Sequence, residues 1–150
     1  MKLYILGLLF IIQFSAEAQI LVPVKWTFTN TKISTNVYDL HFKAFIKSGW
    51  HIYSQVQPKN SVATPLNVVF EKNKSIKFIN NIKEVGKLSK HYEKSIGVTN
   101  YQYSNSLDVI QRVEILAGSK TVIKGTLTYQ TCNDKQCLPP EDEFFEIRIN

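Results

Sequence analysis

Residues 38–47 read YDLHFKAFIK, and this stretch decides the fold class of the chain. Apolar side chains occupy every second position from Tyr38 to Ile46, and polar or charged side chains lie between them, with Phe45 as the exception. A period of two is that of a β-strand with one face on a hydrophobic core and the other in solvent. We therefore predict a half-buried strand over residues 38–47.

Similar patterns recur on both sides of this stretch. Residues 24–29, 107–115 and 145–149 alternate in the same way, and residues 121–129 are rich in β-branched side chains. We count about eight or nine strands at a spacing close to ten residues, and no helical apolar stripe of comparable length. The chain is therefore predicted to be all-β, an immunoglobulin-like antiparallel β-sandwich, with a closed barrel as the alternative. Turn-forming residues are found at Ser48-Gly49, Pro58–Ser61, Asn73-Lys74, Asn80-Asn81 and Ala117–Ser119.

The first residues have the composition of an export signal. Residues 1–18 combine a basic start, an apolar run from Leu3 to Phe14, and small residues at the two positions that a signal peptidase reads. This order is typical of a secretory signal peptide cleaved before Gln19. An uncleaved membrane anchor is the alternative, but the run of about 12 residues is shorter than the roughly 20 that span a bilayer. We expect an exported domain over residues 19–150 with no further membrane span.

The composition narrows the possible functions. The chain has 150 residues, which suits one domain, and 44% hydrophobic residues, which is enough for a packed core. Its 2 cysteines are too few for a disulfide-scaffolded miniprotein or for a zinc site made of cysteines alone. The net charge of +6 comes from scattered lysines, and export makes nucleic acid an unexpected partner. The charge indicates a solvated surface or attraction toward an acidic partner protein.

Both cysteines lie in residues 129–140, YQTCNDKQCLPP. Four residues separate Cys132 from Cys137, Asn133-Asp134 favours a turn, and Pro139-Pro140 ends it, so we predict a hairpin with a bridged or bridgeable tip. Cross-linking so short a segment contributes only about 2 kcal/mol in the chain-entropy model. A bond at a hairpin tip is, however, open to a partner thiolate. The spacing leaves a structural disulfide and a redox-active pair both open, with metal binding and hydrolytic chemistry as weaker alternatives.

The charges near the pair predict no strongly activated thiolate. Lys135 favours a thiolate, whereas the acidic residues 141–143 disfavour it. If the pair is redox-active, we expect a passive shuttle that is driven by a more reactive thiol on a partner. The three histidines lie at no ligand spacing from the cysteines, so no metal site is predicted, and His51 is interpreted as a surface residue of a strand.

Residues 82–97, IKEVGKLSKHYEKSIG, are the least regular part of the chain. The stretch is polar and charged and contains two glycines, so we predict a long loop between strands, with at most one short strand inside it. Loops of this length in compact domains are often functional. A lid and a solvated connector are both open from the composition.

Two segments together resemble a known family. Gly49-Trp-His-Ile-Tyr53 and Tyr129-Gln-Thr-Cys132 through Cys137-Leu-Pro-Pro140 are similar to the N-terminal periplasmic domain of the thiol:disulfide interchange protein DsbD, also called the disulfide bond corrector domain. The resemblance covers about residues 24–149. It implies an immunoglobulin-like sandwich with the cysteine pair on a hairpin, so that the pair itself is the redox site.

The resemblance also implies a role for each site residue. Cys137 is expected to form mixed disulfides with partners and Cys132 to resolve them. The family has a loop that covers the disulfide with an aromatic side chain, and the matching stretch here is residues 91–97, with Tyr92 or Ile96 as the cover. Trp50 and Tyr53 are expected either to flank the disulfide or to belong to the core.

Partners and location follow from the same resemblance. Electrons would arrive from a thioredoxin-like exported or membrane-tethered protein and pass to periplasmic oxidoreductases such as disulfide isomerases or cytochrome-maturation proteins. No cofactor is expected, because the cysteines carry the electrons, and the domain is expected to be a periplasmic monomer. Two departures stand out: the cysteine spacing is one residue shorter than in the best-known member, and a chain ending at Asn150 would be a standalone copy that needs a separate donor. The alternative function is a non-enzymatic immunoglobulin-like binding module with a structural disulfide.

Overall fold

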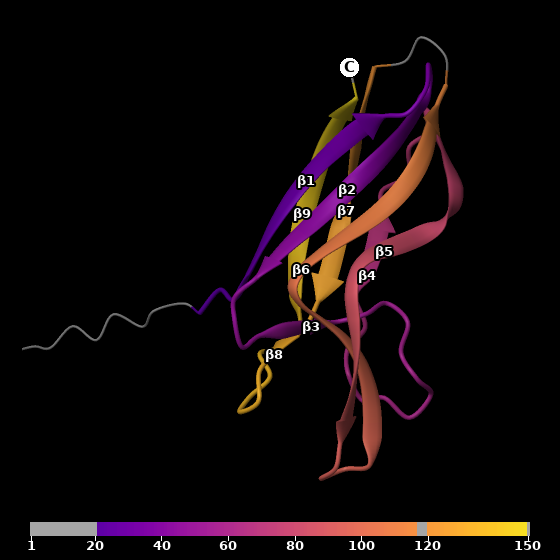
Figure 1. Cartoon of the computed structure of the whole chain (residues 1–150). Helices are drawn as coiled ribbons and strands as arrows, with labels where there is room; N and C mark the ends of the chain where they lie inside the picture. The colour runs from indigo at the N-terminus through magenta and orange to yellow at the C-terminus, as the bar shows by residue number, and fades with distance from the viewer. Residues whose placement is uncertain (1–20, 117–119, 150) are drawn as a thin grey trace, which may run out of the picture.

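The computed structural model describes residues 21–116 and 120–149, and within these ranges the chain forms strands and turns with no helix (Figure 1). Accordingly, no helix that could cross a membrane is found in the described part of the chain. The predicted signal peptide and the predicted turn at residues 117–119 lie outside the described residues. The strands are β1 (Val24–Lys32), β2 (Val37–Ile46), β3 (His51–Tyr53), β4 (Asn67–Phe70), β5 (Ile76–Glu93), β6 (Val98–Ile115), β7 (Thr121–Tyr129), β8 (Thr131–Cys132) and β9 (Glu141–Ile149).

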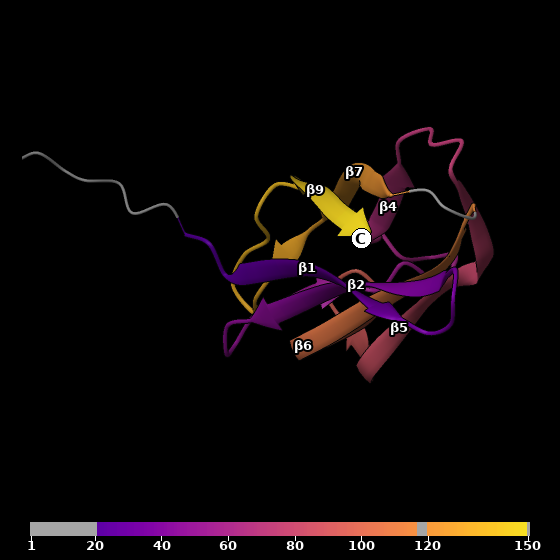
Figure 2. The ribbon, with the colours of Figure 1, turned by 90° about the horizontal axis from the view of Figure 1, so that it is seen from above.

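The strands form two antiparallel sheets packed face to face, which confirms the predicted immunoglobulin-like sandwich. One sheet has the order β1-β2-β6-β3-β8, with β5 also paired to β6, and the other has the order β4-β7-β9. Seen from above, β1, β2, β5 and β6 lie in one layer, and β4, β7 and β9 lie in the other (Figure 2). The long strand β6 is central to the first sheet, because it pairs with β2, β3 and β5.

The alternation in β2 places its apolar face on the core, as predicted. Leu40 and Phe42 are completely buried, whereas the exception Phe45 is 57% exposed on the outer face. The Phe42 ring meets that of Phe145 from the opposite sheet with centroids 4.8 Å apart, in an edge-to-face arrangement. Aromatic pairs in this geometry contribute beyond the area that they bury. The core is thus closed by side chains from both layers.

The predicted long loop over residues 82–97 is wrong. Residues up to Glu93 belong to β5, which pairs with β6 along most of its length, with a register shift between Gly86 and Leu88 and a turn after Glu93. No alternating pattern marks this strand, because most of β5 is exposed on both faces at the edge of its sheet. Backbone pairing with β6, rather than an apolar face, holds this strand.

The predicted turn at Asn80-Asn81 is also wrong, because these residues form an irregularity inside β5. The register with β6 shifts between Ile79 and Lys83, and Asn80 takes a positive φ of 61°. Asparagine tolerates the left-handed region better than most residues, which explains why a turn-like pair is found within a strand. The buried side chain of Gln111 donates to the carbonyl oxygens of Ile79 and Asn80 at 3.2 and 3.3 Å.

Gly125 marks the tightest approach in the three-stranded sheet. It lies on β7 between its register partners Phe70 on β4 and Phe145 on β9, whose rings pack with centroids 5.5 Å apart. A Cβ atom at this position would clash with the carbonyl oxygen of Val69 and lie 2.5 Å from Cζ of Phe145. The obstacle is partly backbone, so it cannot move without disturbing the ladder.

We expect Gly125→Ala to lower the free energy of unfolding by about 1–3 kcal/mol, the range for overpacked sites. Chemical denaturation followed by fluorescence measures this change. The neighbouring Lys124→Ala removes only a solvent-exposed ion pair with Glu146 and should cost about 0–1 kcal/mol. Equal stability of Gly125→Ala and the wild type would contradict the close packing described for β7.

Candidate functional site

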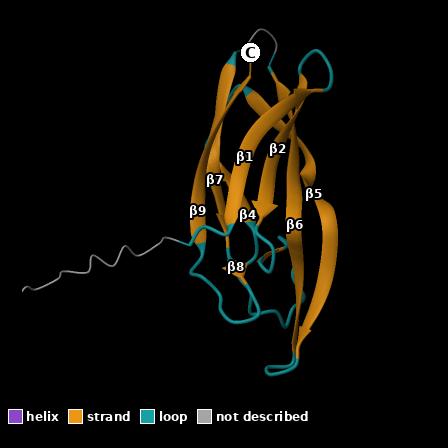
Figure 3. Ribbon diagram, turned by 60° about the vertical axis from the view of Figure 1, so that its left-hand side comes forward, coloured by secondary structure: helices purple, strands orange, loops and turns teal. Residues whose placement is uncertain are grey.

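The two cysteines lie at one end of the sandwich, where the chain passes from one sheet to the other. Strand β7 ends at Tyr129 in the three-stranded sheet, and β8 then pairs with β3 in the larger sheet. The chain returns through residues 133–140 to β9, beside β7. Figure 3 shows loops gathered around β8 at this end, with the β5–β6 hairpin extending past them. Because the chain passes between the sheets here, the cysteine hairpin lies at the end of both sheets.

The hairpin tip has the local structure that its sequence predicts. Cys132 and Cys137 are joined by a disulfide, with Cα atoms 4.0 Å apart. The side-chain oxygen of Asn133 accepts hydrogen bonds from the backbone N–H groups of Lys135 and Gln136 at 2.8 and 2.9 Å, which is the behaviour expected of asparagine in a turn. The prolines precede β9 and lie outside the ladder, as expected.

The two sulfur-bearing residues differ sharply in exposure. Cys132 is 1% exposed, whereas Cys137 is an exposed residue. The buried residue is the one that lies in β8, where Thr131 and Cys132 pair with Ile52 and His51 of β3. Of the two cysteines, Cys137 is therefore the one that is more accessible to a protein thiolate approaching from solvent.

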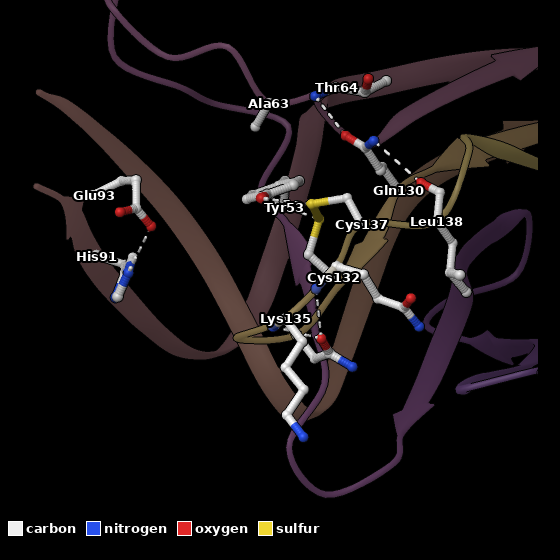
Figure 4. The surroundings of a disulfide bond; sticks show 12 residues. Tyr53, Ala63, Thr64, His91, Glu93, Gln130, Cys132, Lys135, Cys137 and Leu138 are labelled. Carbon is white, nitrogen blue, oxygen red and sulfur yellow. Dashed lines mark hydrogen bonds and ion pairs between the residues drawn. A yellow bond between two sulfur atoms is a disulfide. The ribbon is translucent and has the colours of Figure 1, made fainter. Parts of the chain in front are cut away.

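Tyr53 lies against the disulfide, on the side of the buried sulfur. Its hydroxyl donates a hydrogen bond to Sγ of Cys132 at 3.2 Å and lies 3.9 Å from Sγ of Cys137 (Figure 4). Burial raises the pKa of the Tyr53 hydroxyl above its ordinary value, and the nearby carboxylate of Glu93 adds to the effect. The phenol therefore keeps its proton at neutral pH and acts as a donor.

Of the two aromatic residues predicted near the disulfide, the structure brings only Tyr53 to it. Trp50 is 8% exposed and belongs to the hydrophobic core cluster. The preceding Gly49 has a positive φ of 81° in the tight turn after β2, a conformation that glycine adopts without strain. The Gly-Trp segment therefore turns the chain and anchors it in the core, so that the two residues of β3 that flank Ile52 face the site.

A cavity of about 340 Å³ separates the cysteine hairpin from the β5–β6 hairpin. Tyr92 and Ile96, predicted to cover the disulfide, are 57% and 59% exposed and do not line it. Successive side chains of a strand point to opposite faces, and the residues on either side of Tyr92 line the cavity instead. The cavity is lined by His51, Tyr53, His91, Glu93, Asn100, Gln102, Cys132, Asn133, Asp134 and Cys137.

Sequence reasoning missed His91 and Glu93 as residues of this site. His91 and Glu93 flank Tyr92, so in a strand their side chains share the face opposite to that of Tyr92. This pattern identifies them only once residues 82–93 are recognised as a strand. Their side chains approach each other, with 3.9 Å between Nε2 of His91 and a carboxylate oxygen of Glu93. Among the described residues, no group of three or more His, Cys, Asp or Glu side chains is arranged to hold a metal ion.

The segment between β3 and β4, residues 54–66, is held by hydrogen bonds near both ends. At its start, Glu84 of β5 accepts hydrogen bonds from the Ser54 hydroxyl at 2.5 Å and the Gln55 backbone N–H at 2.8 Å. Near its other end, the Gln130 side chain accepts from the backbone N–H of Thr64 and donates to the carbonyl oxygen of Leu138, each at 3.2 Å (Figure 4). Gln130 therefore ties this segment to the exit of the cysteine hairpin, which gives the Tyr-Gln-Thr-Cys motif a structural role.

Comparisons with solved structures identify similar folds. The N-terminal domain of Neisseria meningitidis DsbD in the reduced form matches with a TM-score of 0.53 and 17% identity, over 83% of this chain and 86% of that chain. The N-terminal periplasmic domain of ScsB from Proteus mirabilis matches with a TM-score of 0.53 and 16% identity, over 82% of this chain and 44% of that chain. A complex between the DsbD and PilB N-terminal domains of Neisseria meningitidis gives a TM-score of 0.51 and 15% identity, over 86% of this chain and 88% of that chain.

No curated protein sequence matches this chain significantly. The family model described as the N-terminal domain of the thiol:disulfide interchange protein DsbD, however, matches residues 17–149. That match spans both motifs and all of the described strands, and the fold and the bridged hairpin agree with it. The chain therefore belongs to the DsbD N-terminal domain family.

Proposed function

We propose that this chain is a periplasmic thiol–disulfide exchange domain that relays two electrons between a thioredoxin-like donor and exported oxidoreductases. The observation that carries the proposal is the asymmetry of the Cys132–Cys137 disulfide. Cys137 is an exposed residue, whereas Cys132 is buried and its sulfur accepts a hydrogen bond from the Tyr53 hydroxyl. Exchange requires one sulfur that can be attacked and one that can leave as a stabilised thiolate.

In the proposed reduction, a thiolate of the donor attacks Sγ of Cys137. A bond forms between the donor sulfur and Cys137, the Cys132–Cys137 bond breaks, and Cys132 leaves as a thiolate that accepts the hydrogen bond from Tyr53. A second donor thiolate then attacks the donor sulfur of the mixed disulfide, and Cys137 leaves as a thiolate. The donor becomes a disulfide and the domain a dithiol, so two electrons have moved and no cofactor is needed.

The reduced domain would pass these electrons on by the same chemistry in reverse. Sγ of Cys137 attacks a disulfide of the acceptor, and Cys132 then closes the pair again. The exposed apolar side chains of Tyr92 and Ile96, near the tip of the β5–β6 hairpin, are proposed as contacts for such partners. The solved complex of a related DsbD domain with a PilB domain supports a protein partner. The predicted signal peptide and the family's location support the periplasm.

Replacing each cysteine in turn shows which one carries the mixed disulfide. We expect Cys132→Ala to accumulate a stable adduct with the disulfide of a thioredoxin-like protein through Cys137. Cys137→Ala should form little or none, because Cys132 is buried. Mass spectrometry of non-reduced mixtures identifies the linked sulfur.

Failure of both variants to form adducts would favour the alternative binding module with a structural disulfide. That alternative also predicts a reduction potential below roughly −300 mV, the range of structural disulfides. A measured potential above this range, together with adduct formation only through Cys137, is the result expected of the exchange domain.

The variant Tyr53→Phe tests the role of the Tyr53 hydroxyl. Tyr53→Phe keeps the ring but removes the donor to the leaving sulfur, and a hydrogen bond to a charged group contributes about 1.5–3 kcal/mol. We expect reduction of the disulfide by a thioredoxin-like dithiol to slow by about tenfold, which corresponds to about 1.4 kcal/mol in the barrier. Stopped-flow fluorescence or quenched gel assays measure the rate.

Tyr101→Phe is the matched control for this variant. Tyr101 lies on β6 with the ammonium of Lys90 5.3 Å from its ring centroid, a contact that phenylalanine retains. The control should exchange at the wild-type rate. An unchanged rate in Tyr53→Phe would show that its hydroxyl does not assist the departure of Cys132.

A further inference from the structure

His51 lies directly opposite the buried cysteine. It is the register partner of Cys132 in the antiparallel pairing of β3 with β8. Side chains of directly opposite residues share one face of the sheet, with Cβ atoms about 4.5–5.5 Å apart. The His51 ring also meets that of Tyr53, two residues along the same face, with centroids 5.4 Å apart. The imidazole thus belongs to the cysteine site, although its sequence position suggested an ordinary surface strand residue.

The side chains around His51 come from β3, β5, β6 and the cysteine hairpin. The cavity receives Tyr53 from β3 itself, the neutral Asn100 and Gln102 from β6, and Asp134 with the two cysteines from the hairpin. Lys135 extends away from the two sulfurs (Figure 4). The remaining titratable groups, contributed by β5, are His91 and Glu93.

This environment keeps the His51 imidazole neutral. Burial lowers the pKa of His51 below its ordinary value, and repulsion from a positive charge on His91 lowers it further. The negative charge of Asp134 acts in the opposite direction. A neutral imidazole has a lone pair that can accept a proton. Half-buried His51 therefore has the properties of a base in contact with the cavity.

Cys132 needs such a base in one direction of the exchange. A buried thiol is slow to ionise, because its thiolate lacks water. Tyr53 stabilises a thiolate once it has formed, but its raised pKa keeps its own proton in place, so it cannot accept another. The site therefore has a donor for the thiolate and requires a separate acceptor for the proton.

We propose that His51 accepts the proton of the Cys132 thiol when the pair closes and releases its partner. This inference rests on the proposed thiol–disulfide exchange and adds the residue that moves the proton. In the step, a ring nitrogen of His51 takes the proton while Sγ of Cys132 attacks Sγ of Cys137. The Cys132–Cys137 bond forms, the bond from Cys137 to the partner breaks, and the partner sulfur leaves as a thiolate with the electron pair. His51 then returns the proton to solvent.

The step can be followed with dithiodipyridine as the probe. The reduced domain reacts first through Cys137, in a phase whose rate depends on reagent concentration and which releases one pyridinethione. Attack by Cys132 releases the second pyridinethione in a phase that is independent of concentration. The second phase therefore reports the proposed proton transfer separately from the first attack.

The expected effect depends on pH. An unperturbed thiol with a pKa near 8.5 is only about one-thirtieth ionised at about pH 7, and burial lowers that fraction further, so a base can accelerate the second phase by roughly 30-fold or more there. We expect His51→Gln to slow this phase by about tenfold near pH 7 and by progressively less as the pH rises, because hydroxide then ionises the thiol without help. Recovery of the rate at high pH also shows that the variant is folded.

Two further variants make the test specific. His41 lies on β2 with its imidazole 2.9 Å from a carboxylate oxygen of Asp108, outside the cavity lining, and His41→Gln should leave both phases unchanged. His91→Gln removes the other imidazole of the cavity and the positive charge that lowers the pKa of His51, so the second phase should keep its dependence on His51 with the pH profile displaced toward higher pH. A pH-dependent loss in His91→Gln with none in His51→Gln would overturn the assignment.

A slowing in His51→Gln that is equal at all pH values would also overturn it, because that result indicates a structural role. These failures differ from failure of the proposed function. If the wild-type disulfide does not exchange with thioredoxin-like proteins at any pH, the proposed function is wrong. If it exchanges while His51→Gln keeps the wild-type profile with dithiodipyridine, only the proton-transfer role is wrong.

Discussion

The short antiparallel pairing of β3 with β8 is the constraint on which the site depends. Only two register pairs form it, His51 with Cys132 and Ile52 with Thr131. The pairing draws the chain after β7 across to the other sheet, buries one cysteine in a ladder and leaves the other at an exposed tip. This short, long-range pairing thus distinguishes two cysteines that are equivalent in the sequence, burying Cys132 and leaving Cys137 exposed.

The same pairing sets the electrostatics of the buried sulfur. Successive odd-numbered residues of β3 share a face, so His51 and Tyr53 both reach the side of the sheet on which Cys132 lies. One is a protonated phenol and the other a neutral imidazole, because burial disfavours the charged form of each. The strand therefore supplies a hydrogen-bond donor and a proton acceptor at adjacent positions of one face.

The rest of the sandwich holds this arrangement rigid. The edge-to-face contact of Phe42 with Phe145 joins the two sheets, and the close packing around Gly125 fixes β7 against β4 and β9 within the smaller sheet. The hydrogen bonds of Glu84 tie residues 54–66 to β5 near one end, and those of Gln130 tie them to the end of the cysteine hairpin near the other. Well-packed interiors transmit such constraints because they have few voids.

The sequence by itself determined the all-β class, the strand over residues 38–47 and the bridged hairpin, because alternation and turn chemistry are local properties of the chain. It failed at β5, where an edge strand exposed on both faces shows no alternation. The exposure of each sulfur, and the meeting of His51, Tyr53 and Cys132, were decided only by tertiary structure. Cys132 is far from His51 and Tyr53 in the chain, and only the register between β3 and β8, which no local pattern encodes, brings it to them.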